Sequence, residues 1–113
     1  MGWVTDALNA LEAGRNAEVR PIGGSMKGRI ESGDLVTIAP VGDREVQPGD
    51  VVFVRWKASY LLHFAKEISR PASGVALVLI ANNLGRENGW TELTDVVGIV
   101  VAVKSGRAPI AFR

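Results

Sequence analysis

Hydrophobic residues follow two periods along this chain, a helical one near the N-terminus and a strand-like one over most of the remainder. Between positions 3 and 11, apolar residues recur at spacings of three and four, as on one face of an α-helix. They are Trp3, Ala7, Leu8 and Leu11. With Gly14 as a stop signal, the pattern predicts one short amphipathic helix within residues 1–14. We expect its apolar face to pack on the domain, with docking to a membrane surface or a partner as the alternative.

Short runs rich in β-branched and aromatic residues follow, and turn sequences such as Gln47-Pro48-Gly49-Asp50 separate them. The expected strands are Val19–Ile22, Leu35–Val41, Val51–Trp56, Tyr60–Ile68, Val75–Ile80, Val96–Val103, interrupted at Gly98, and an edge piece at Pro109–Phe112. Short strands at this spacing predict an all-β barrel or sandwich. The expected fold class is therefore all-β, mainly β-strands with one short N-terminal helix.

The length and composition fit one domain spanning residues 1–113. Hydrophobic residues make up 47% of the chain, which is enough for a core. No repeat, linker or low-complexity stretch divides the chain. We expect the helix at 1–14, a core at 20–103 and a tail at 104–113.

Charge and residue counts exclude several classes of function. The chain has 13 Lys and Arg against 12 Asp and Glu, which argues against binding nucleic acid through bulk positive charge. The absence of cysteine excludes disulfides, thiol catalysis and cysteine-ligated zinc. A single histidine argues against the usual catalytic zinc sites, which use two or three. We therefore expect no metal and no cofactor.

The apolar runs are all shorter than the ~20 residues that span a bilayer. The N-terminal residues also lack the basic start and the long apolar block of a signal peptide. The expectation from these two features is a soluble cytoplasmic domain without a transmembrane segment.

Candidate chemistry begins at Gly23-Gly24-Ser25. Two glycines before a serine permit a tight turn that presents the hydroxyl and aims backbone N–H groups at one point, as in an oxyanion hole. A hydroxyl needs a neighbouring base to become a good nucleophile, and His63 is the one side chain whose unperturbed pKa suits that role near neutral pH. The alternatives are an ordinary glycine-serine loop and a structural histidine in the apolar run Leu61–Ala65.

The order of these pieces resembles the superfamily of LexA-type repressors and signal peptidase I, which are Ser-Lys and Ser-His peptidases. The resemblance covers about Arg20 to Val103. The matching pieces are Gly23-Gly24-Ser25-Met26 for the nucleophile box, Ile30 to Asp34 for the segment after it, Gln47 to Val52 for the Pro-Gly-Asp strand entry, His63 for the base, Ala81-Asn82-Asn83 for the Gly-Asp-Asn box and Val97 to Val100 for the last strand.

This resemblance implies a coiled, multi-stranded β fold with Ser25 as nucleophile and His63 as general base, as in the histidine branch of signal peptidases. It places Asn82 where an acidic residue orients the imidazole; an amide orients the ring without supplying charge. Two further departures are Gly28, where the family has proline, and Phe64, where it often has arginine.

Two other sets of residues are candidates for the site. Lys66 is an alternative base, since burial lowers the pKa of a lysine. The polar segment 82–91 is either a plain connection with two turns or a substrate loop with Arg86 and Trp90 as anchors.

The main hypothesis is a serine peptidase that cleaves a peptide bond in a protein substrate or in itself. The alternative is a catalytically weak or inactive module that binds a peptide or protein in the same groove. Pairing of exposed strands into a homodimer is compatible with the resemblance.

Overall fold

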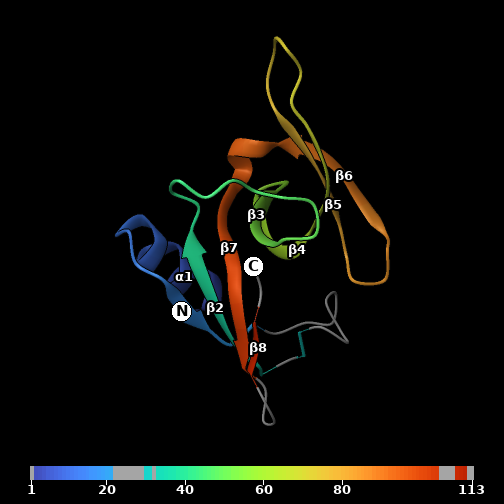
Figure 1. The fold of residues 1–113 in the computed structure, drawn as a ribbon. Coiled ribbons are helices and arrows are strands. Elements are labelled where there is room, and N and C mark those ends of the chain that lie inside the picture. Colours follow the sequence, from blue (N-terminus) through green and yellow to red (C-terminus); the bar gives the residue numbers. More distant parts are fainter. Residues whose placement is uncertain (1, 22–29, 32, 105–108, 112–113) are drawn as a thin grey trace.

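A computed structural model describes residues 2–21, 30–31, 33–104 and 109–111. These residues form one helix, α1 (Trp3–Glu12), and one antiparallel sheet of eight strands, which confirms the all-β class (Figure 1). The strands are β1 (Ala17–Val19), β2 (Leu35–Pro40), β3 (Val51–Trp56), β4 (Ser59–Ser69), β5 (Leu77–Ala81), β6 (Glu87–Glu92), β7 (Val96–Lys104) and β8 (Pro109–Ala111). A short 3-10 helix, η1 (Leu93–Asp95), joins β6 to β7.

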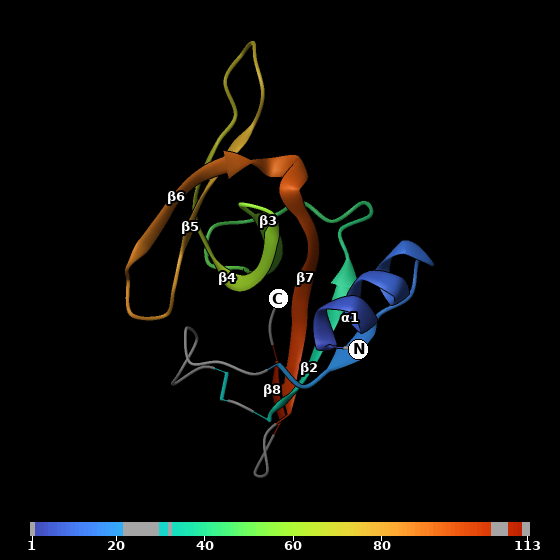
Figure 2. The ribbon, with the colours of Figure 1, turned by 180° about the vertical axis from the view of Figure 1, so that it is seen from behind.

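The strand order is β1-β2-β7-β3-β4-β5-β6, and β8 pairs with the end of β7. The sheet is strongly coiled, with β3 and β4 curling between β7 on one side and the β5–β6 hairpin on the other (Figure 1). Helix α1 contacts β1 and β2, and the view from behind shows it lying across β2 (Figure 2). The helix stripe therefore packs on the domain, as expected.

Two apolar clusters form the core on the two sides of β3 and β4, because alternate side chains of a strand point to opposite faces. The first gathers under α1 and includes Val51, Phe53 and Leu62. The second lies toward β5 and includes Val52, Val54 and Ala65. Strand β3 is buried on both faces over Val51–Val54, so it is the central strand of the fold.

The expected strands agree with the observed ones at most positions, and the expected interruption of the last long strand at Gly98 is wrong. Strand β7 runs through this glycine with a bulge beside it. Strand β6 was not expected, because Asn88-Gly89 inside Glu87–Glu92 is typical of a turn. The polar segment 82–91 is therefore a tight turn followed by the sheet's outer strand, and not one long loop.

The turn between β3 and β4 leads to a stability prediction. It has two residues, Lys57 and Ala58, whose φ angles are 48° and 64°. Such turns favour Asn-Gly, because side chains with a Cβ pay for a left-handed backbone. Ala58→Gly should therefore raise the free energy of unfolding by about 1 kcal/mol in urea denaturation. Ala13→Gly is the control, since Ala13 has a φ of −84° and should show no such gain. A free energy of unfolding for Ala58→Gly at or below the wild-type value would mean that this turn is unstrained.

Candidate functional site

His63 lies in the middle of β4, directly opposite Val52 of β3. Its side chain is on the face that carries the second apolar cluster, and the residue is only 5% exposed. A buried imidazole among valines is costly unless its polar atoms are satisfied. Its hydrogen-bond partner therefore decides what the ring can do.

That partner is Asn88 of β6, whose Oδ1 lies 2.8 Å from Nδ1 of His63. An amide oxygen carries no proton, so Nδ1–H donates this bond and Nε2 keeps the free lone pair. Burial lowers the pKa of His63 from its ordinary value of 6.5, and the bond to Asn88 opposes part of that effect. Burial therefore favours the neutral form of the ring, in which Nε2 is the atom that accepts a proton.

Asn82, assigned from the sequence as the residue that orients His63, has a different role in the structure. Its Oδ1 accepts hydrogen bonds of 2.9 Å from the backbone N–H groups of both Leu84 and Arg86. These bonds brace the β5–β6 turn, a common use of asparagine. The orienting bond to His63 comes instead from Asn88, six residues further along the chain.

Lys66 is a poor candidate for the base. Its Nζ lies 2.6 Å from Oε2 of Glu87, and both side chains are nearly half exposed. This hydrogen bond and the charge of Glu87 raise the pKa of Lys66 above its ordinary value. Burial lowers a lysine pKa enough for base catalysis, but Lys66 is exposed and paired with an acid. Of the two candidate bases, His63 has the suitable environment.

Arg86 and Trp90, the expected anchors of a substrate loop, lie on the β5–β6 hairpin. Arg86 is exposed at the end of the turn, and Trp90 is 47% exposed on β6, opposite Leu79 of β5. A half-exposed tryptophan on the outer strand of a sheet is accessible for docking an extended segment. The structure places both residues on the surface of this hairpin.

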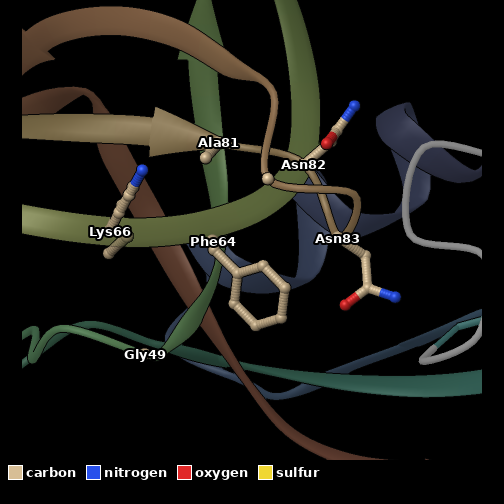
Figure 3. A pocket seen from close by; sticks show the side chains of 8 residues that line it. Gly49, Phe64, Lys66, Ala81, Asn82 and Asn83 are labelled. Carbon is tan, nitrogen blue, oxygen red and sulfur yellow. The ribbon is translucent and has the colours of Figure 1, made fainter.

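A hollow of about 320 Å³ opens beside the residues that follow His63 (Figure 3). Its lining includes Gly49, Phe64, Lys66, Ala81, Asn82 and Asn83. The ring of Phe64 projects into it, and polar side chains lie around its rim (Figure 3). Apolar walls with a few polar groups are typical of ligand pockets, although this one is at the small end of their range.

Gly23, Gly24 and Ser25 lie outside the described residues, so the hypothesis of an oxyanion turn and a nucleophile beside His63 stays a prediction. Within the described ranges, no group of three His, Asp or Glu residues is placed to hold a metal ion. No helix within these ranges has the length and apolar character needed to cross a membrane.

No family model, curated protein or solved structure matches this chain.

Proposed function

We propose that this protein is a peptidase in which Ser25 is the nucleophile and His63 is the general base. The observation that carries the proposal is the state of His63: a buried, neutral imidazole whose Nδ1–H is held by Asn88, which leaves Nε2 to accept a proton. A base with this arrangement is what a serine nucleophile requires. The order of sequence motifs around Ser25 supports its pairing with His63.

In the proposed reaction, Nε2 of His63 removes the proton from Oγ of Ser25 as this oxygen bonds to a peptide carbonyl carbon. The tetrahedral intermediate carries its negative charge on the former carbonyl oxygen, toward which the backbone N–H of Ser25 and a neighbouring donor would point. The imidazolium then protonates the leaving amine as the C–N bond breaks. Water, activated by the same base, hydrolyses the acyl-serine ester and restores both residues.

One observation favours the second candidate, a peptide-binding module with weak catalysis. The partner of His63 is an amide, which orients the ring but does not offset the positive charge that the ring gains in the transition state. The outer strand β6, with the exposed Trp90, provides an edge to which an extended peptide could add.

The two candidates differ in what Ser25→Ala does to peptide cleavage. We expect the wild-type protein to release new N-termini from a peptide library or from itself, detected by mass spectrometry. Ser25→Ala should lower this rate about a thousandfold or more, because the covalent route is lost. Ser59→Ala, at an exposed serine that begins β4, is the control and should leave the rate unchanged. Equal rates in wild type and Ser25→Ala would exclude the peptidase, and peptide binding without cleavage would leave the binding module.

A further inference from the structure

We infer that Asn88 is a positioning residue that holds His63 in the Nδ1–H tautomer and so leaves Nε2 as the ring atom that accepts a proton. The role of Asn88 in catalysis rests on the proposed peptidase function, whereas its effect on the tautomer of His63 does not. The bond from Nδ1 to Asn88 Oδ1 measures 2.8 Å, well within hydrogen-bond range. In a neutral histidine, the hydrogen bonds made at the two ring nitrogens decide which nitrogen carries the proton.

A β-bulge brings Asn88 to the ring. In the pairing of β5 with β6, Ile80 lies opposite Gly89 and Ala81 lies opposite Glu87, so Asn88 is an extra residue without a partner. A bulge of this kind re-aims a side chain out of the regular alternation of the strand. Strand β5 separates β4 from β6, and the re-aimed Asn88 reaches across it to His63.

The next residue, Gly89, supports the same geometry. Its φ is 139°, and a Cβ added there would lie 3.1 Å from Cη2 of Trp56. A side chain at this position would press on the indole and would also strain the backbone. The pair Asn88-Gly89 is thus used here to build a bulge in a strand rather than the hairpin turn that this dipeptide usually forms.

Among the described residues, the neighbouring polar side chains of Asn82, Lys66 and Glu87 bond to groups other than the ring. The side-chain oxygen of Asn82 accepts two backbone N–H groups of its own turn. Lys66 and Glu87, the charged residues next to this site on β4 and β6, are paired with each other. Within the described part of the chain, Asn88 is the residue that hydrogen-bonds to the ring of His63.

The test is the tautomer of His63, measured by the ¹⁵N shifts of its two ring nitrogens. The chain has one histidine, so the signals need no assignment. At a pH well above the His63 pKa, the wild-type ring should carry its proton on Nδ1. Asn88→Ala should move a large part of the population to Nε2–H, because the acceptor is gone. Asn88→Asp should retain Nδ1–H, since a carboxylate accepts the same bond. Asn9→Ala, at an exposed asparagine of α1, is the matched control and should match the wild type.

An unchanged tautomer in Asn88→Ala, with a native amide spectrum, would overturn the inference whatever the activity. For the peptidase reaction, Asn88→Ala should lower kcat about tenfold or more and leave KM nearly unchanged, because the ring acts in the chemical step. A shifted tautomer in a protein without any Ser25-dependent cleavage would refute the peptidase proposal and leave the role of Asn88 in holding the ring intact.

Discussion

Gly98→Ala should lower the free energy of unfolding by about 2–3 kcal/mol, which is the largest single-methyl effect that we expect in this protein. A Cβ at this position would lie 2.5 Å from Cγ2 of Ile38 and 3.1 Å from both the Ala39 carbonyl oxygen and Cδ1 of Leu11. A Cβ contact below 3 Å forces a neighbour to move, and here one neighbour is backbone and another is a fully buried core side chain. Glycine at 98 therefore allows β2 and α1 to approach β7 closely.

The measurement is urea denaturation followed by circular dichroism, with Gly2→Ala as the matched control. Gly2 has open space around its Cα, and its φ is −91°. Gly2 is the N-cap residue of α1, where alanine is less favourable than glycine, so the same change there should cost less than about 1 kcal/mol, well below the loss at Gly98. A second check combines Gly98→Ala with Ile38→Ala, which removes the closest clashing atom. The stability losses of the two single variants should sum to more than the loss measured for the double variant. Wild-type stability of Gly98→Ala would show that α1 and β2 do not pack closely on this glycine.

Much of the fold was predictable because buried segments show as apolar patterns in the sequence. The central strand β3 begins with a continuous, buried apolar run, Val51–Val54, and the expected range Val51–Trp56 is confirmed at both ends. The stripe that predicted α1 is likewise confirmed, with the helix ending at Glu12. The weaker prediction was Val19–Ile22, where the observed strand is Ala17–Val19, because a three-residue strand carries too few alternating positions to define its limits.

The outer strand β6 and the partner of His63 were not predictable by the same rules. Strand β6 has one exposed edge and mostly polar residues, so hydrophobic periodicity carries no signal there. Asn88 reaches His63 through a bulge, and a bulge is a property of strand pairing that local sequence does not specify. The Asn-Gly pair was the available signal: it marks a site where glycine's backbone freedom is used, in a turn or in a bulge.

The choice between the two candidate bases also required the structure. His63 and Lys66 are three residues apart in the same strand, and regular alternation would place their side chains on opposite faces. Lys66 is the extra residue of a bulge between β4 and β5, so regular alternation does not hold beyond Ala65. Its ion pair with Glu87 comes from a strand that was not expected to exist. Without that strand, neither the raised pKa of Lys66 nor the partner of His63 could be anticipated.

Asn88→Asp should increase the Ser25-dependent rate of peptide cleavage about tenfold or more if the proposed function is right. The substitution replaces the amide oxygen 2.8 Å from Nδ1 with a carboxylate oxygen, while the hydrogen bond and the tautomer are retained. An adjacent carboxylate stabilises the imidazolium that forms when Nε2 takes the serine proton. The rate is best compared near pH 8.5, because an opposite charge raises the pKa of His63 by about one to three units and the base must be neutral at the start.

The control for added charge is Leu84→Asp, which places a carboxylate on the same hairpin at a side chain that is 80% exposed. It should leave both the cleavage rate and the pKa of His63 near their wild-type values. A rate for Asn88→Asp equal to that of Leu84→Asp, with a raised pKa of His63, would mean that His63 is not the base in the reaction.

The same substitution should reverse the pH dependence of stability around neutral pH, which is measurable without any substrate. In the wild type, burial lowers the folded-state pKa of His63 below the ordinary 6.5 of the unfolded chain. The unfolded state then binds more protons, so this contribution to stability is present above pH 6.5 and is lost as the pH falls through the folded-state pKa.

In Asn88→Asp the carboxylate raises the folded-state pKa of His63 above 6.5. The contribution is then fully present below pH 6.5 and is lost as the pH rises through the new pKa. Urea denaturation at several values between about pH 5.5 and 8 should therefore give slopes of opposite sign for the two proteins, and slopes of the same sign would show that the carboxylate at 88 does not reach His63.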